Sequence, residues 1–310
     1  MQTSNLKLQK LSRQPSLFKR NELLRPFLKW AGGKRQLLPE LRKYYPNKLE
    51  YYYEPFLGAA AVLFDLQPKH ATISDFNSEL INVYNVIKNN ADGLIEKLQY
   101  HQENNSEEYF YELRAIDRNE QFKELSLINK AARIIYLNKT CFNGLFRVNN
   151  QGQFNVPYGS YENPLIVDEI VIKAVSHYLN NADIKIFNLD FADAVVDAKK
   201  NDFIYFDPPY HPISDTSSFT GYNLQSFGED DQIRLRDCCD DLIDRGCNIL
   251  LSNSDSQFIR DLYSDESRYS IYTIKTVQAR RSINAVSTGR GKINEVLIFN
   301  NYSYVKPYKK

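Results

Sequence analysis

The most distinctive chemistry in this chain lies in the tetrapeptide Asp207-Pro208-Pro209-Tyr210, which follows a predicted strand over 202–206. Proline has no backbone N–H, so the two prolines add only carbonyl acceptors beside the carboxylate. A side-chain acceptor and a backbone acceptor in fixed places suit an exocyclic amino group. The Tyr210 ring offers a face for stacking a planar ring. Taken alone, the four residues could also be a strand-terminating turn without a catalytic role.

An exocyclic amine on an aromatic ring is a poor nucleophile because its lone pair is delocalised into the ring. Two acceptors for its hydrogens favour a pyramidal nitrogen and free that lone pair. The electrophile must still be strong, and a sulfonium methyl group fits, with in-line positioning supplying most of the remaining catalysis. Asp207, with an ordinary pKa of about 3.9, need not act as a strong base. The tetrapeptide therefore indicates methyl transfer to a planar amine.

Two glycine-containing segments near the N-terminus point to a bound nucleotide-like group. Gly32-Gly33 lets backbone amides approach an anion, and Lys34 adds a positive charge, although the spacing is not that of a P-loop. Further on, a strand leads into a turn at Gly58, a helix follows, and the next strand ends at Asp75. Strand, glycine turn, helix and strand with a terminal acid form the nucleotide-binding half of an α/β sheet.

The remaining pattern predicts one α/β domain interrupted by an insertion. Helices are expected over 36–44, 59–66, 78–138, 168–180 and 230–245. Further strands are expected over 184–187 and 248–252, with two closing antiparallel strands over 269–276 and 295–299. Residues 141–159 contain two β-like runs around an Asn-Asn-Gln-Gly turn, which predicts a hairpin. The predicted units are a basic tail (1–24), a discontinuous catalytic domain (25–77 and 166–310) and an insertion of helices and a hairpin (78–165).

Charge is segregated along the chain although the net charge is only +1. No acidic residue occurs in 125–161 or in 267–294. Such segregation can give a nearly neutral protein a basic, nucleic-acid-binding face, although solvated surface is the simpler alternative. The basic residues of these two segments are Lys130, Arg133, Lys139, Arg147, Arg268, Lys275, Arg280, Arg281, Arg290 and Lys292.

Other features narrow the class of protein. No apolar run reaches the roughly 18 residues that a membrane helix needs, and residues 1–24 lack a signal-peptide stretch, so we expect a cytoplasmic protein without membrane association. The hydrophobic fraction of 43% is enough for a globular core. None of the cysteines forms a C-x-x-C pair or has a histidine at ligand spacing. We therefore expect reduced, buried thiols and no metal.

Several long motifs, in this order, resemble the Dam-type (D12 class, alpha group) DNA adenine N6-methyltransferases, and most of all the GATC-specific branch of restriction–modification systems. The resemblance covers about residues 25–300 and implies a Rossmann-like, S-adenosylmethionine-dependent methyltransferase sheet whose insertion is a target-recognition domain. The motifs are F-L-K-W-A-G-G-K-R, Y-E-P-F-L-G, S-D-F-N-S-E-L-I-N, F-N-G-L-F-R-V-N, Q-F-N-V-P-Y-G, Y-F-D-P-P-Y, L-S-N-S and R-G-K-I-N-E.

The resemblance implies a set of cofactor-binding residues. Asp75 suits the ribose hydroxyls and Asp190 matches a carboxylate near the cofactor adenine, although Asp190 could also be a surface acid and Trp30 a core aromatic. The chain departs from the family at Gly58-Ala59-Ala60, where the pattern is usually G-x-G, and we expect binding with altered affinity. The expected residues are Trp30, Ala31, Gly32, Lys34, Glu54, Pro55, Phe56, Gly58, Asp75, Phe76, Asp190, Phe191 and Asp207.

The resemblance also implies a DNA-binding set, because adenine must be flipped out of the duplex to reach the tetrapeptide. Phe142 and Asn143 are expected at the vacated site, and Lys29 near the first base pair. Phe142 and Leu145 could instead be hairpin core, and Arg147 plain surface. Base-edge contacts are expected from Leu145, Arg147, Pro157 and Tyr161, with further DNA contacts from Lys139 and Asn149.

The sequence thus predicts a monomeric S-adenosylmethionine-dependent enzyme that methylates adenine N6 in double-stranded DNA. A cognate restriction endonuclease would be a functional partner. Two alternatives stay open. One is a methyltransferase that acts on RNA or another planar amine. The other is a DNA-binding homologue without activity, which the alanine at Ala60 suggests.

Overall fold

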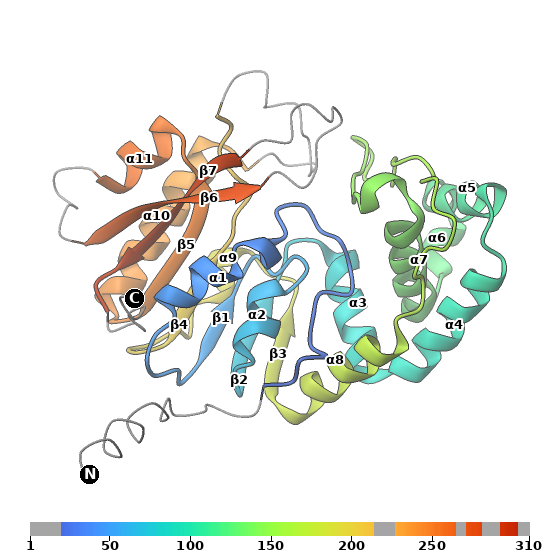
Figure 1. The fold of residues 1–310 in the computed structure, drawn as a ribbon, viewed down its shortest axis with the longest axis horizontal. Helices are drawn as coiled ribbons and strands as arrows, with labels where there is room; N and C mark the ends of the chain where they lie inside the picture. Colours follow the sequence, from blue (N-terminus) through green and yellow to red (C-terminus); the bar gives the residue numbers. More distant parts are fainter. Residues whose placement is uncertain (1–19, 214–226, 265–270, 281–291, 303–310) are drawn as a thin grey trace, which may run out of the picture.

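The computed structural model describes residues 20–213, 227–264, 271–280 and 292–302. Its centre is a seven-stranded sheet in the order β3-β2-β1-β4-β5-β7-β6 (Figure 1). The strands are β1 (Tyr52–Glu54), β2 (His70–Ser74), β3 (Asp183–Phe187), β4 (Phe203–Phe206), β5 (Asn248–Ser254), β6 (Tyr272–Arg280) and β7 (Lys292–Asn300).

Strands β1 to β5 are parallel to one another, whereas β7 pairs antiparallel with both β5 and β6. This confirms the predicted alternation and the antiparallel closing strands. The chain winds outward from β1 through β2 to β3, and then returns to β4 on the other side of β1. The order therefore reverses between β1 and β4, and ligands of open α/β sheets bind outside the carboxyl ends of the strands at such a point.

Helices cover both faces of the sheet. One face carries α2 (Ala61–Leu66), α3 (Ser78–Asn89) and α8 (Glu169–Asn181), and the other carries α9 (Phe191–Ala194), α10 (Glu229–Asp244) and α11 (Gln257–Ser264). Successive side chains of a strand point to opposite faces. Accordingly Tyr52 packs in the core of the first face and Tyr53 in that of the second. The predicted helix 36–44 is broken into η1 (Lys34–Gln36), α1 (Leu38–Leu41) and η2 (Arg42–Tyr44).

The helical prediction for 78–138 is confirmed. After α3 come α4 (Ala91–Glu103), α5 (Glu107–Ala115), η3 (Ile116–Arg118), α6 (Gln121–Glu124) and α7 (Leu127–Thr140). Helices α4 to α7 gather beyond α3 and α8, beside the β3 end of the sheet (Figure 1). Buried side chains of α7, α3 and the sheet belong to one continuous hydrophobic cluster. The boundary of a separate recognition domain stays a prediction.

The predicted hairpin over 141–159 is wrong in its strands and right in its turn. Two isolated antiparallel bridges, Cys141 to Tyr158 and Val148 to Phe154, replace a regular ladder, and Phe142–Gly144 forms the short 3-10 helix η4. The turn is closed by the Gly152 N–H, which donates to the Asn149 carbonyl. Backbone pairing is limited to the residues beside the turn, where the Asn149 N–H donates to the Gln153 carbonyl and the Asn155 N–H donates to the Arg147 carbonyl. Hereafter this segment is called loop 141–159.

Some sequence predictions fall outside the described residues. These are the tail over 1–19 and the basic residues Arg268, Arg281 and Arg290. No helix in the described part of the chain is long and apolar enough to cross a membrane.

Ala60 has an unusual backbone conformation at the start of α2. Its φ of 56° and ψ of 35° are left-handed, and its N–H donates to the Leu57 carbonyl at 2.8 Å. A Cβ in this region costs roughly 1–2 kcal/mol, which glycine avoids. The departure from the G-x-G pattern therefore places strain in the turn.

We predict that Ala60→Gly is less destabilising than Ala61→Gly. Both changes remove one buried methyl group and add one flexible residue, but only the first relieves a left-handed alanine. The free energies of unfolding, measured with urea, should differ by about 1–2 kcal/mol in favour of Ala60→Gly. Equal losses in the two variants would show that the turn stores no strain.

Candidate active site

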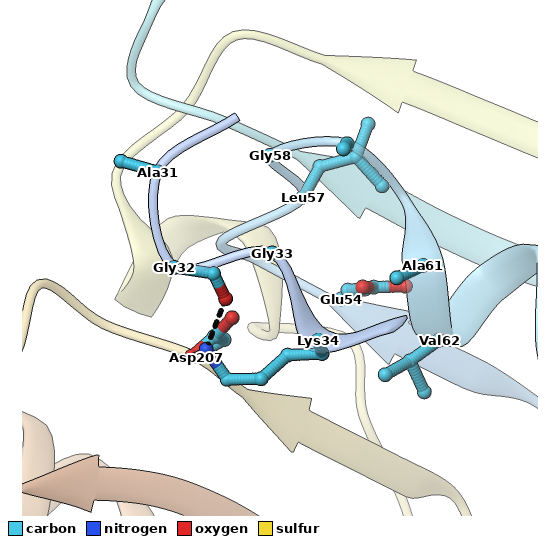
Figure 2. A pocket seen from close by; sticks show the side chains of 11 residues that line it. Ala31, Gly32, Gly33, Lys34, Glu54, Leu57, Gly58, Ala61, Val62 and Asp207 are labelled. Atoms are coloured by element: carbon cyan, nitrogen blue, oxygen red, sulfur yellow. Dashed lines mark hydrogen bonds and ion pairs between the residues drawn. The ribbon is translucent and has the colours of Figure 1, made fainter. Parts of the chain in front are cut away.

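The tetrapeptide 207–210, called the D-P-P-Y loop below, lies directly after β4 at the reversal point of the sheet. The Asp207 carboxylate meets the buried ammonium of Lys34, with 2.7 Å between Oδ1 and Nζ. Lys34 belongs to η1 and also donates to the Gly32 carbonyl (Figure 2). The glycine segment and the D-P-P-Y loop, far apart in sequence, therefore form one site.

Burial changes the acid–base chemistry of this carboxyl. Desolvation raises the pKa of Asp207 to about 6, against the lowering effect of Lys34, and Glu295 raises it further. The pKa of Asp207 is therefore higher than the ordinary value of about 3.9 that was expected from the sequence. Asp207 is therefore a better proton acceptor at neutral pH than an exposed aspartate.

A pocket opens between β1, the Gly58 turn and η1 (Figure 2). Glu54, at the end of β1, is a buried carboxyl that accepts a hydrogen bond from the Tyr52 hydroxyl at 2.9 Å. Burial holds the pKa of Glu54 well above its usual range. The lining residues are Ala31, Gly32, Gly33, Lys34, Glu54, Leu57, Gly58, Ala59, Ala61, Val62 and Asp207.

Asp75 fixes the Gly58 turn from the end of β2. Its two carboxylate oxygens accept the N–H groups of Gly58 and Asn77, each at 2.9 Å. The Tyr84 hydroxyl donates to the Gly58 carbonyl. Burial raises the pKa of Asp75, partly offset by these backbone hydrogen bonds. Asp75, the acid after β2, thus shapes the Gly58 turn and also presents its carboxylate oxygens at the edge of the sheet.

Trp30 joins this turn to loop 141–159. Its ring stacks on Phe146 with 4.6 Å between ring centroids, and a Cβ on Gly58 would come within 3.2 Å of it. Gly58 has a φ of +49°, so both backbone geometry and Trp30 require glycine here. Trp30 packs against the core and also contacts the site, so the two interpretations of it are compatible.

The D-P-P-Y loop has hydrogen-bond and cation–π partners that no sequence pattern indicated. The Tyr210 hydroxyl donates to Glu295 of β7 at 2.8 Å, and Lys34 Nζ lies 4.7 Å from the Tyr210 ring centroid. Gln232 Nε2 donates to the Pro209 carbonyl at 2.9 Å. The motif R-G-K-I-N-E contained Glu295 without indicating this contact, and nothing in the sequence pointed to Gln232.

Asp190 and Phe191 lie after β3, outside the lining of the pocket. Arg234 of α10 forms two hydrogen bonds to Asp190, at 2.7 and 2.8 Å, and its guanidinium lies 4.1 Å from the centroid of the Phe191 ring. These hydrogen bonds lower the pKa of Asp190. Phe56 stacks on Phe191 at 5.5 Å, whereas Phe76 is mostly exposed. The buried Pro55 is a further expected cofactor residue that does not line the pocket.

Loop 141–159 presents several of the expected DNA-binding residues. Phe142 is 47% exposed, which rules out the interpretation that it is core, whereas Leu145 is half-buried and packs against the core. Asn143 takes a left-handed φ of 58°. Pro157 is exposed, and its carbonyl accepts the Phe142 N–H. The loop therefore presents an aromatic ring at the surface, as insertion into a duplex would require.

Lys29 lies beside this loop although it comes from the N-terminal segment. Its backbone N–H and carbonyl are both bound by the Asn138 side chain, which also donates to the Gly144 carbonyl. Its Nζ lies 5.7 Å from the Tyr161 ring centroid. Lys139 is half-buried nearby, and burial lowers its pKa.

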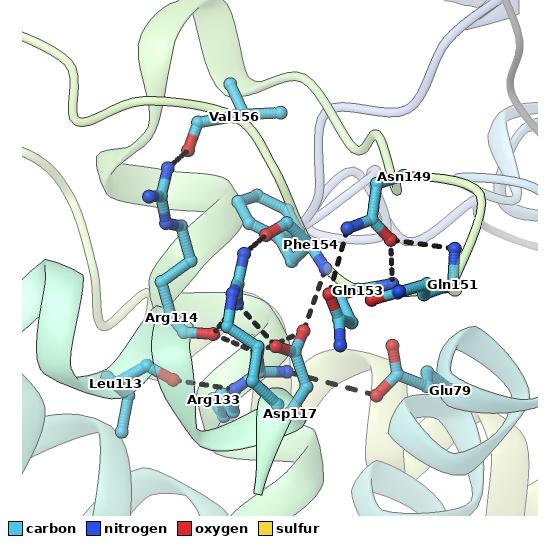
Figure 3. Close-up of polar contacts among 11 residues, drawn as sticks. Glu79, Leu113, Arg114, Asp117, Arg133, Asn149, Gln151, Gln153, Phe154 and Val156 are labelled. Atoms are coloured by element: carbon cyan, nitrogen blue, oxygen red, sulfur yellow. Dashed lines mark hydrogen bonds and ion pairs between the residues drawn. The ribbon is translucent and has the colours of Figure 1, made fainter.

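Arg147 is exposed and oriented by one neighbour. Its Nε donates to Asn155 Oδ1 at 2.7 Å and its Nη2 donates to the Asn155 carbonyl at 3.5 Å, which leaves Nη1 and the second Nη2 hydrogen without a partner within the described chain. Asn149 differs, because its side chain binds Gln153 and the N–H groups of Gln151 and Gln153 within the turn (Figure 3). Asn149 therefore shapes the turn, and a DNA contact from it stays a prediction.

Arg133 is not part of a basic surface. It is only 1% exposed, and its Nη2 lies 2.7 Å from Asp117, which also accepts the Phe154 N–H (Figure 3). Arg118 and Arg114 donate to the carbonyls of Phe154 and Val156. These side chains hold loop 141–159 on the helices.

An exocyclic amine that binds at this site needs two hydrogen-bond acceptors for its two hydrogens. Pro209 already accepts from Gln232, whereas no described residue donates to the Pro208 carbonyl. Asp207 and Pro208 are therefore the available acceptor pair. Among the described residues, no group of three or more His, Cys, Asp or Glu could hold a metal ion.

Comparison with known proteins agrees with this site. The family model for D12 class N6 adenine-specific DNA methyltransferases matches residues 30–283. The type II methyltransferase M1.LlaDCHI of Lactococcus lactis subsp. cremoris is 48% identical over 92% of this chain and 99% of its own length. The type II methyltransferase M.MjaIII of Methanocaldococcus jannaschii is 42% identical over 89% and 99%. The DNA adenine methylase of Escherichia coli K12 is 33% identical over 92% and 99%. The chain therefore belongs to the D12 class of N6 adenine-specific DNA methyltransferases.

Proposed function

We propose that this enzyme transfers a methyl group from S-adenosylmethionine to the N6 of adenine in double-stranded DNA, within GATC, by flipping the adenine into the D-P-P-Y pocket. The observation that supports this most is the meeting of Lys34 and Asp207 at 2.7 Å, at the sheet edge where α/β folds bind their ligands. The GATC sequence is proposed from the resemblance of the motifs in loop 141–159.

The residues of the pocket fit the charges of the cofactor. Its amino-acid end is a zwitterion beside a sulfonium, and the pocket offers the Lys34 ammonium together with the carboxyl groups of Glu54 and Asp207. A Cβ on Gly33 or Gly58 would approach Trp30 to 3.2 Å, so glycines keep the backbone exposed there. Asp75 has lone pairs left for the ribose hydroxyls, and we place Asp190, held by Arg234, near the adenine.

The chain's own part in the reaction is to hold the target amine. The Asp207 carboxylate and the Pro208 carbonyl accept the two N6 hydrogens, and the Tyr210 ring stacks on the flipped base. When bound, S-adenosylmethionine supplies a methyl group on a positively charged sulfur. The N6 lone pair forms the new N–C bond, the C–S bond breaks with its electrons going to sulfur, and an N6 proton passes to Asp207 or water. The cofactor product is S-adenosylhomocysteine.

Target recognition falls to loop 141–159 and its neighbours. The exposed Phe142, with Asn143, is proposed to fill the space that the adenine leaves. Leu145, Arg147, Pro157 and Tyr161 would contact base edges, with Lys29 near the first base pair. The enzyme would act as a monomer in the cytoplasm or nucleoid. It would protect DNA beside a cognate restriction endonuclease or mark it epigenetically.

The direct test is methylation of a duplex containing one GATC site by the purified chain, with N6-methyladenine identified by mass spectrometry. Asp207→Ala should lose at least about 10²-fold in rate, the loss typical for removing one preorganised polar contact to a reacting group, while DNA binding persists. Full turnover by Asp207→Ala would overturn the site. A single-stranded RNA of matched sequence tests the RNA alternative, and turnover by the unaltered chain excludes an inactive homologue.

The raised pKa of Asp207 predicts a pH dependence. If the ionised carboxylate is required, kcat/KM should be flat above neutral pH and fall as the pH drops through about 6. Lys34→Met removes the charge that favours the ionised form, so the acid limb should move to higher pH. Lys43→Met, which removes an exposed lysine paired with Glu40, is the control and should leave the limb in place. An unmoved limb in Lys34→Met would mean that this ion pair does not control the titration.

Arg147 is predicted to read a guanine of the site. Because Asn155 holds Nε and one Nη2 hydrogen, Nη1 and the second Nη2 hydrogen can donate to guanine O6 and N7. Arg147→Ala should cost about 1–3 kcal/mol of discrimination at one base pair, measured as methylation rates on GATC and its single-base variants. Lys139→Ala should instead weaken binding to all duplexes alike and reduce its salt dependence. A uniform loss in Arg147→Ala would exclude base readout.

A further inference from the structure

The D-P-P-Y loop cannot be held in place by hydrogen bonds from its own prolines, because they have no N–H groups. Besides the contacts of Lys34 and Glu295 with the loop, three hydrogen bonds hold Pro209 and His211, the residue that follows the loop. Gln232 Nε2 donates to the Pro209 carbonyl at 2.9 Å. The His211 N–H donates to Asn253 Oδ1 at 3.2 Å, and Ser254 Oγ donates to the His211 carbonyl at 2.6 Å. Asn253 and Ser254 belong to the L-S-N-S motif, for which the proposed reaction has no use.

These contacts form one connected relay. Asn253 Nδ2 donates to Gln232 Oε1 at 3.0 Å, so the amide of α10 and the amide of β5 fix each other's orientation. Both side chains are fully buried. If the Gln232 amide were reversed, its oxygen would face the Pro209 carbonyl and its NH₂ would face Asn253 Nδ2. Only one orientation satisfies every donor, and buried polar groups left without partners are costly.

The relay occupies the Pro209 carbonyl and leaves the Pro208 carbonyl available as an acceptor. We propose that Gln232 and Asn253 are positioning residues for methyl transfer, which bind the Pro209 carbonyl and so set Asp207 and the Pro208 carbonyl as the acceptor pair for the target amine. This inference rests on the proposed function. It assigns a role to Gln232, which no sequence pattern indicated, and to the L-S-N-S motif. Neither residue needs to touch DNA or cofactor to act in this way.

The sharpest test replaces the donor with a group whose donor capacity depends on pH. In Gln232→Glu, the ionised carboxylate can accept from Asn253 but cannot donate to Pro209, whereas the protonated acid can do both. We expect kcat at pH 8 to fall about 10²-fold, the effect of a small misplacement of reacting groups, with KM for the cofactor changed less than threefold. The ratio of variant to wild-type kcat should then rise as the pH is lowered to 6.

Two controls separate positioning from general damage. Gln232→Leu loses both hydrogen bonds and should stay slow at every pH. Gln257→Glu introduces the same charge at an exposed position on α11 and should keep wild-type kcat. His211, which lies 3.4 Å from Glu229, and the carboxyl of Asp207 are present in the wild type as well, so each variant is compared with the wild type at the same pH.

A pH-independent ratio in a folded Gln232→Glu variant, or identical profiles for Gln232→Glu and Gln232→Leu, would overturn the inference alone. If thermal unfolding shows that Gln232→Glu does not fold, Asn253→Asp provides the same titration from the other end of the relay. The aspartate at position 253 keeps an oxygen that accepts the His211 N–H. It can donate to Gln232 only when its carboxyl is protonated. Absence of DNA methylation by the wild-type chain would overturn the proposed function, and this inference with it.

Discussion

The structure depends on burying three carboxyl groups at the reversal point of the sheet, one of which pairs with a buried ammonium. Glu54, Asp75 and Asp207 follow three neighbouring parallel strands, and burial raises the pKa of each. Lys34 is brought to them by a segment that precedes the first strand. A carboxyl whose folded pKa lies above its unfolded value stabilises the protein only at low pH, and that stability is lost as the pH rises through the folded pKa. At neutral pH this cluster therefore lowers stability, as is common where reactivity requires a particular electrostatic environment.

Much of the surrounding polar structure compensates for that burial. Backbone N–H groups bind both oxygens of Asp75, and the Tyr52 hydroxyl binds Glu54.

Glu295 accepts from Tyr210 and adds negative charge beside Asp207, so β7, which is antiparallel and late in the chain, also belongs to the site. The antiparallel closing strands therefore do more than complete the sheet, because they fix the last residue of the D-P-P-Y loop.

The site and loop 141–159 are physically continuous. Trp30 lies between the Gly58 turn and Phe146, and the backbone of Lys29 is held by the same asparagine that binds Gly144. On the other side, the buried Arg133 and Asp117 anchor the second half of the loop to the helices. The Gly58 turn and the N-terminal segment with Lys29 and Trp30 are thus linked to loop 141–159 by direct contacts.

The sequence by itself determined the class of fold, the order of its elements and part of the pocket lining (Gly32, Lys34, Gly58 and Asp207), because strand alternation, glycine turns and acids at strand ends are local patterns. It also predicted the turn in loop 141–159. Only the tertiary structure decided which backbone groups that loop would pair with. Arg114, Arg118 and Asp117 come from helices more than thirty residues away and bind backbone groups of Phe154 and Val156 that the pairing of the two runs does not use. For the same reason Arg133 looked like surface charge and is buried, and Gln232 looked like an ordinary helical residue and binds Pro209. A long-range hydrogen bond leaves no periodicity in the sequence, so these partners appear only when the chain is folded.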